Sequence, residues 1–171
     1  MILRMCGIEP ESIVDGPGFR YVVFVQGCPH KCPGCHNPQS HSYEDGYDLG
    51  VQKLYDEIRS NPYLAGVTFS GGEPFTQVKP LLALAKMLKS DGLSLMSYSG
   101  YTLEELQARG DADTDELLGL LDILVDGRFI EEERNLTLLY RGSENQRVID
   151  MNKTRAQGEV VLWKSEFEID F

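Results

Sequence analysis

Residues 21–35 read YVVFVQGCPHKCPGC, a β-rich run that passes directly into three closely spaced cysteines. Val, Phe and Tyr favour strands, so residues 21–25 are predicted to form one. Cys28, Cys32 and Cys35 follow with the spacing C-x3-C-x2-C. Three thiolates are enough to hold a metal centre but are one short of a closed four-sulfur site. The stretch therefore raises the question of what fills the fourth position.

Outward from this stretch, the chain alternates β-rich runs with segments of helical period. Three further runs are predicted strands: 66–70 (GVTFS), 93–98 (LSLMSY) and 122–127 (DILVDG). Two segments place their apolar residues on one helical face: Val51, Leu54, Tyr55 and Ile58 in the first, and Leu81, Leu82, Ala85 and Leu88 in the second. Such alternation is typical of β-α units and a largely parallel sheet.

The rest of the chain has weaker signals. Capping-box spacing predicts two short helices, one beginning at Thr102 with Glu105 and one at Asp113 with Glu116. Residues 136–140 (LTLLY) and 159–163 (EVVLW) are β-rich and are predicted to be strands without a defined place in the sheet.

These elements predict an α/β fold with mostly parallel strands, in which the sheet curls toward a barrel. A full barrel of eight β-α units takes about 250 residues, whereas this chain has 171. We therefore expect a partial, open (β/α) barrel. Residues 1–171 are expected to form one domain, in which the secondary structure of residues 151–171 is poorly assigned.

Charge and cysteine use limit the class of protein. The formal net charge is −11, with 27 acidic against 16 basic residues, which argues against nucleic acid or anionic membrane surfaces as partners. Residues 1–10 have too short an apolar stretch for a signal peptide, so we expect a cytosolic protein. In the cytosol, clustered cysteines indicate metal binding or redox chemistry. Cys6 is expected to be a buried or idle thiol, with a fourth-ligand role as the lesser alternative.

In sheets of this kind the chemistry collects at the carboxyl ends of the strands. Four segments follow predicted strands: the cysteine loop, residues 71–74 (GGEP), the turn 97–101 and Asp126-Gly127. We expect all four to face the same side of the sheet.

Two kinds of metal centre fit the cysteine spacing. In the first, His30 or His36 joins Cys28, Cys32 and Cys35 in a structural zinc site. In the second, the three thiolates hold an iron–sulfur cluster and leave one iron open to a small molecule. The sequence pattern alone leaves both open.

The spacing C-x3-C-x2-C after a first strand resembles the radical S-adenosylmethionine family. The resemblance implies a 4Fe–4S cluster held by the catalytic, metal-binding residues Cys28, Cys32 and Cys35, with the open iron binding S-adenosylmethionine. One electron then splits the sulfonium and releases a 5′-deoxyadenosyl radical. The family usually has an aromatic residue before the third cysteine, where this chain has Gly34. Stacking on the adenine would then come from elsewhere; His36 is one candidate, and its plainer interpretation is a polar loop residue.

The same resemblance implies further cofactor-binding residues. Gly71, Gly72 and Glu73 match the family's GGE motif, which contacts the methionyl amino group of the cofactor. The backbone of the turn that begins at Ser97 is implied to line the site. Asp126 is implied to help organise the cofactor side of the barrel, and its plainer interpretation is an Asp-Gly turn former.

Residues 15–20 (DGPGFR) resemble a segment of activating enzymes that install glycyl radicals on partner proteins. Three segments resemble the activating proteins of anaerobic ribonucleoside-triphosphate reductases: 97–106 (SYSGYTLEEL), 122–129 (DILVDGRF) and 141–150 (RGSENQRVID). The implied reaction abstracts a glycine α-hydrogen from that reductase and leaves a glycyl radical. It needs an external low-potential electron donor such as flavodoxin or ferredoxin. The alternatives are the activation of another glycyl-radical enzyme, of the formate-lyase type, and a non-catalytic zinc or iron–sulfur binding module.

Overall fold

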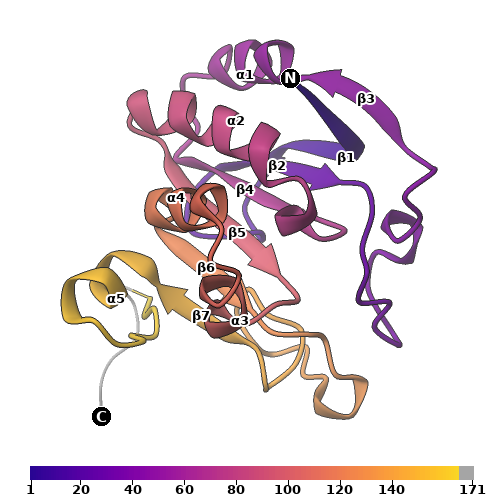
Figure 1. Ribbon diagram of the computed structural model, residues 1–171, viewed down its shortest axis with the longest axis vertical. Helices are drawn as coiled ribbons and strands as arrows, with labels where there is room; N and C mark the ends of the chain where they lie inside the picture. The colour runs from indigo at the N-terminus through magenta and orange to yellow at the C-terminus, as the bar shows by residue number, and fades with distance from the viewer. Residues whose placement is uncertain (166–171) are drawn as a thin grey trace.

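A mixed sheet runs through residues 1–165, the part of the chain that this computed structural model describes (Figure 1). Its seven strands in that part have the order β3-β1-β2-β4-β5-β6-β7. Their bounds are β1 Ile2–Ser12, β2 Arg20–Val25, β3 Tyr47–Gly50, β4 Gly66–Gly71, β5 Ser94–Ser99, β6 Ile123–Asp126 and β7 Arg147–Asp150. The ladders β2·β4, β4·β5 and β5·β6 are parallel, and the ladders at both edges are antiparallel. The expectation of mostly parallel strands therefore holds only for the centre of the sheet.

All but the last α-helix of the described residues lie in the connections between the parallel strands, and the last α-helix follows β7. Their bounds are α1 Val51–Arg59, α2 Val78–Ser90, α3 Leu103–Gln107, α4 Ala112–Leu120 and α5 Met151–Gln157. The helices α1, α2 and α4 lie over the same face of the sheet (Figure 1). No helix of residues 1–165 is both long and apolar enough to cross a membrane.

The core lies mainly between these helices and the sheet. Alternate strand residues, among them Val23, Val67, Phe69, Leu95 and Leu124, are buried there against helix residues. Each such side chain stabilises the fold by about 1.5–3 kcal/mol when it is fully buried.

The intervening strand residues point to the opposite face of the sheet. Met96, Ile123 and Val125 form a second buried cluster there, which Tyr98, Tyr140, Val148 and Trp163 extend. The sheet is therefore covered on both sides, by helices on one face and by loop segments on the other.

The central elements were predicted correctly. The strands expected at 21–25, 66–70, 93–98 and 122–127 are confirmed as β2, β4, β5 and β6, and the two helical stripes as α1 and α2. The first predicted capping box is also confirmed: Oγ1 of Thr102 accepts the N–H of Glu105 at 3.1 Å, and Oε1 of Glu105 accepts the N–H of Thr102 at 3.4 Å.

Two predicted strands outside the centre were wrong, and the second predicted short helix forms with an earlier start. Residues 136–140 form turns, and residues 159–163 contribute a single bridge, between Leu162 and Ile149. In both cases β-branched and leucine residues are present, but 136–140 lies outside the seven-strand order, and 159–163 meets β7 only through residues 161–163. The second helix start also lies elsewhere: α4 begins after Asp111, whose carboxylate accepts the N–H of Asp113 at 3.3 Å.

Four elements were not predicted at all: β1, β3, β7 and α5. The helix α5 falls in the poorly assigned segment 151–171, of which residues 166–171 lie outside the described residues.

Candidate functional site

The segments that follow β2, β4, β5 and β6 meet around one cavity of about 770 Å³. They contribute, in chain order, Cys28, Gly72, Gly100 and Gly127 to its lining. The loops after β2 and β6 extend beyond the carboxyl ends of these strands and flank the site (Figure 1). The parallel order of the four central strands thus brings together the segments that the sequence singled out.

The three clustered cysteines all border this cavity as free thiols. Cys28 is buried, with 7% of its surface exposed, whereas Cys32 and Cys35 are half-buried. The loop between the last two is tight, because the N–H of Cys35 donates to the carbonyl of Cys32 at 3.1 Å. Burial raises the pKa of the Cys28 thiol, which favours its protonated form.

The donor set is spread around the cavity. Within residues 1–165, no three His, Cys, Asp or Glu side chains converge as ligands of one metal ion. A zinc ion would need each sulfur within about 2.3 Å of one point. Cys6, the remaining cysteine, lies half-buried on β1 and does not border the cavity. All three clustered thiols border the same cavity, so the residues present fit a cluster with three protein ligands.

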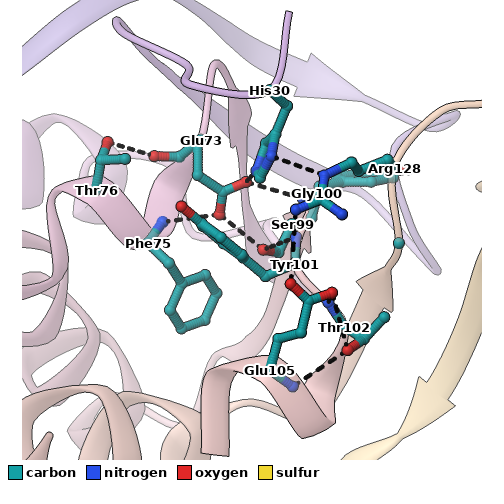
Figure 2. Close-up of polar contacts among 12 residues, drawn as sticks. His30, Glu73, Phe75, Thr76, Ser99, Gly100, Tyr101, Thr102, Glu105 and Arg128 are labelled. Atoms are coloured by element: carbon teal, nitrogen blue, oxygen red, sulfur yellow. Dashed lines mark hydrogen bonds and ion pairs between the residues drawn. The ribbon is translucent and has the colours of Figure 1, made fainter. Parts of the chain in front are cut away.

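Glu73 is buried at the edge of this cavity, with 1% of its surface exposed. Oε1 accepts the hydroxyl of Ser99 at 2.7 Å and the N–H of Phe75 at 3.2 Å. Oε2 accepts the N–H of Gly100 at 2.8 Å and lies 3.1 Å from Nε2 of His30 (Figure 2). The surrounding loops therefore engage both carboxylate oxygens.

Gly71 and Gly72 let the turn after β4 pack directly against the end of β2. Gly71 has a φ of +99°, and a Cβ there would clash with the backbone of Val25. A Cβ on Gly72 would clash with the carbonyl of Gly27, to which the N–H of Glu73 donates at 2.8 Å. The two glycines thus hold the turn beside the cysteine loop. Because they have no side chains, a ligand at this turn would contact their backbone groups.

His36 borders the cavity beside an aromatic ring from another segment. Its imidazole packs edge-on against Phe129, with ring centroids 5.3 Å apart. Gly34 also faces Phe129: a Cβ at position 34 would lie 3.3 Å from that ring. Phe129 was missed from the sequence, although the segment DGRF places an aromatic residue just beyond the end of β6.

Ser97 and Asp126 do not border the cavity. Ser97 is buried and donates its hydroxyl to the carbonyl of Tyr98 at 3.0 Å. Oδ2 of Asp126 accepts the N–H of Leu103 at 2.7 Å, at the start of α3, and its carboxylate pairs with Arg147 at 2.6 Å. The structure therefore gives Asp126 contacts that join β6, β7 and α3.

Other lining residues had no signal in the sequence. They come from β4, the cysteine loop and the segment after β6: Ser70, Asn37, His41, Leu136, Tyr140 and Gln146. The buried Nε2 of His41 has no hydrogen-bond partner among the described residues.

The segment DGPGFR is fixed through the buried side chain of Arg20. Its guanidinium donates to the hydroxyl of Thr68 at 2.8 Å and to the carbonyl of Val67 at 3.0 Å. Burial lowers the pKa of Arg20 to about 10, so the side chain stays protonated at neutral pH. The same Thr68 hydroxyl donates to the carbonyl of Asp15 at 2.8 Å, which brings residues 14 and 15 to the cavity.

Comparison with known proteins adds a family match. A family model described as a 4Fe-4S single cluster domain matches residues 14–149. The anaerobic ribonucleoside-triphosphate reductase-activating protein of Salmonella typhi is 33% identical over 146 residues, which cover 80% of this chain and 92% of that protein. The protein of the same name from Vibrio cholerae is 35% identical over 146 residues, with 80% and 91% covered.

Two further matches were found. The pyruvate formate-lyase-activating enzyme of Clostridium pasteurianum is 34% identical over 136 residues, which cover 76% of this chain but 54% of that enzyme. The crystal structure of QueE from Escherichia coli aligns with a TM-score of 0.48 and 18% identity, over 60% of this chain and 54% of that one. This structural likeness is too low to carry an argument.

Proposed function

The chain belongs to the 4Fe-4S single cluster domain family and to the anaerobic ribonucleoside-triphosphate reductase-activating proteins, and on that premise we propose how its site works. It is a glycyl-radical activating enzyme. Cys28, Cys32 and Cys35 would hold the cluster. The observation that carries this assignment is that all three thiols border one cavity at the carboxyl ends of the parallel strands.

We propose S-adenosylmethionine as the second cofactor. With S-adenosylmethionine bound, the reduced cluster would supply the electron that splits the sulfonium into methionine and a 5′-deoxyadenosyl radical. That radical would take the α-hydrogen of a glycine. The chain has four cysteines and Cys6 lies away from the cavity, so three thiolates are available and one iron is left for the cofactor. The backbone of Gly71 and Gly72 is the polar surface that the turn after β4 offers to the methionyl group.

The adenine site is assigned to the rings beside the third cysteine. Phe129 and His36 both border the cavity and lie next to Gly34, the position at which the resembled family usually has its aromatic residue. We propose Phe129 as the main apolar contact of the base, with His36 beside it.

The sheet is inferred to be an open barrel of the radical S-adenosylmethionine type, formed by one domain over residues 1–171. Support comes from the second buried cluster, around Met96 and Val125, on the face of the sheet opposite the helices. The cytosolic location expected from the sequence stays a prediction.

The protein partner is proposed to be an anaerobic ribonucleoside-triphosphate reductase, with a separate low-potential electron donor such as flavodoxin or ferredoxin. Exposed apolar side chains lie on the loops that border the cavity: Ile13, Val14, Leu136 and Leu139. Val14 and Leu136 line the cavity itself, so a segment of the reductase that reaches the site would cover them. Burial at the contact would also keep solvent from the radical.

The test is anaerobic reconstitution followed by incubation with the reductase, S-adenosylmethionine and a reductant. We expect brown protein with about four irons and four sulfides per chain, and a glycyl-radical signal in the electron paramagnetic resonance (EPR) spectrum of the reductase. A parallel incubation with a formate-lyase type enzyme is expected to give no signal. Colourless protein with one zinc, or a signal on the formate lyase alone, would contradict the proposal.

A further inference from the structure

His30 has a buried side chain in an otherwise exposed part of the cysteine loop. It lies between Cys28 and Cys32, and its neighbours Pro29 and Lys31 are exposed. The imidazole itself is 4% exposed. A polar ring on a surface loop is buried at a cost unless its nitrogens find partners, so its contacts indicate what the burial achieves.

The imidazole contacts each of the other three segments at the strand ends (Figure 2). Its Nε2 lies 3.1 Å from Oε2 of Glu73, after β4. The ring packs edge-on against Tyr101, after β5, with centroids 4.5 Å apart. Its Nδ1 lies 3.3 Å from Nε of Arg128, after β6.

Gly100 makes room for this ring. A Cβ on Gly100 would clash with Cδ2 of His30, and the N–H of Gly100 donates to the same oxygen of Glu73 that the imidazole contacts, at 2.8 Å. The glycine and the histidine therefore fit together around one carboxylate oxygen.

The partners determine which nitrogen carries the proton. A guanidinium only donates, so Nδ1 of His30 accepts from Arg128. In the neutral ring the proton then lies on Nε2, which donates to Glu73. Both nitrogens are thereby used inside the protein, so His30 is not available as a fourth ligand of a metal centre.

We propose that His30 is a positioning residue, which fastens the loop carrying Cys28 and Cys32 to Glu73 and Arg128. The inference rests on the proposed function and deepens it. The sulfurs of this loop then keep a fixed place relative to the strand ends that would bind S-adenosylmethionine. Glu73 acts in the same way, as the acceptor for His30, Ser99 and Gly100.

The first test uses the protein without its cluster and compares three variants by hydrogen exchange. His30→Leu removes both polar contacts, His30→Gln places an amide N–H near the position of Nε2, and His30→Asn replaces only the acceptor near Nδ1. We expect the N–H of Gly100 to exchange at least about tenfold faster in His30→Leu, because its acceptor Glu73 loses a fixed neighbour. His30→Gln is expected to restore slow exchange, and His30→Asn is not.

The second test uses the reconstituted protein and measures affinity for S-adenosylmethionine and the EPR spectrum of the reduced cluster. Residues that hydrogen-bond to the ligands of a metal site typically contribute about 10- to 100-fold to metal affinity or activity. We expect His30→Leu to bind the cofactor at least about tenfold more weakly and to show a smaller spectral change on its addition. His30→Gln should stay within about threefold of the original protein.

Lys31→Gln is the matched control, because Lys31 is an exposed neighbour on the same loop. Unchanged exchange and unchanged cofactor affinity in His30→Leu would overturn the inference, as would a His30→Gln variant as impaired as His30→Leu. If the original protein bound no cluster, the proposed function would fail, while the exchange of the cluster-free protein would still decide the role of His30.

Discussion

The three thiols at the cavity have different surroundings. Cys28 is buried, and burial raises the pKa of its thiol. Sγ of Cys35 lies 3.5 Å from the backbone N–H of Asn37, which donates to it. Hydrogen bonds to ligand sulfurs stabilise the more negative, reduced state of a cluster. Asn37 therefore contributes through its backbone, and a change of its side chain would leave this contact in place.

Replacing any one of Cys28, Cys32 and Cys35 with alanine is expected to abolish cofactor cleavage, since each supplies one of three ligands. Cys6→Ala is the matched control and is expected to retain cleavage and about four irons per chain. Iron content and release of 5′-deoxyadenosine, measured anaerobically, check both statements. Full cleavage in one of the three variants would remove that cysteine from the ligand set.

At this scale the sequence predicted which cysteines border the cavity, but not the contacts that hold their loop in place. Cys28, Cys32 and Cys35 are recognisable because a short spacing places them together whatever the fold. The contacts of His30 come from residues more than 40 positions away, Glu73 at 43 and Arg128 at 98. No local pattern carries that information, so His30 was considered only as a ligand.

Strand alternation explains why two predicted site residues lie elsewhere. On β5, Leu95 is buried on the helix side of the sheet, whereas Met96 belongs to the cluster on the other face. Ser97 follows Leu95 by two positions and shares its face, and Tyr98 shares that of Met96. The same alternation places Val125 and Asp126, which are neighbours on β6, on opposite faces of the sheet. The sequence located the strand ends, and within each strand the two-residue period sets the face of the sheet on which a side chain lies.

Asp126→Asn is expected to destabilise the protein by about 2 kcal/mol, because the buried carboxylate serves both Arg147 and the N–H of Leu103. Urea unfolding of the cluster-free protein measures the change. Affinity for S-adenosylmethionine should remain within about threefold, and a selective loss of affinity at unchanged stability would show that Asp126 acts on the cofactor. Asp113→Asn is the control, since its contact with Lys79 is a 3.8 Å surface pair, expected to contribute less than about 0.5 kcal/mol.

The start of β6 is held by a second carboxylate. Asp122 accepts from Nζ of Lys89 at 2.7 Å, from the N–H of Leu95 at 2.8 Å and from the amide of Asn152 at 2.9 Å. Burial alone would raise its pKa, but these hydrogen bonds outweigh it and hold the pKa of Asp122 below its usual value. Its contacts thus join α2, β5 and α5 to one strand.

Because the folded pKa of Asp122 is depressed, its stabilising contribution is present above about pH 4 and is lost as the pH falls through the folded value. Asp122→Asn is expected to be about 1 kcal/mol less stable near neutral pH. The difference from the original protein should narrow at about pH 3. Urea unfolding at the two pH values checks this, and a constant difference would contradict it.

The site and the main core occupy different parts of the molecule. The core lies between the helices and the sheet, whereas the cysteines lie on a loop beyond the end of β2. The strands β1, β3 and β7, which flank the parallel centre, were not predicted, since tertiary contacts decide such pairings. Within β1, Gly7, Pro10 and two glutamates interrupt any strand pattern.

The cluster-free protein is therefore expected to stay folded and to unfold cooperatively. Cluster loading should raise the midpoint of thermal unfolding by mass action, without changing the far-ultraviolet circular dichroism by more than about a tenth. Circular dichroism of the protein before and after removal of iron measures both. An unfolded cluster-free protein, as in zinc fingers, would show that the centre organises the fold.

The two outer strands of the sheet differ in what covers them. β3 is an outer strand of only four residues. The outer edge of β7 is paired with the segment 161–163: the N–H of Trp163 donates to the carbonyl of Val148, and the N–H of Asp150 donates to the carbonyl of Val161. A bare strand edge is a template on which another chain can pair and aggregate. Proteolysis before Val161 would strip this cover, so the last described stretch of the chain protects solubility as much as it adds stability.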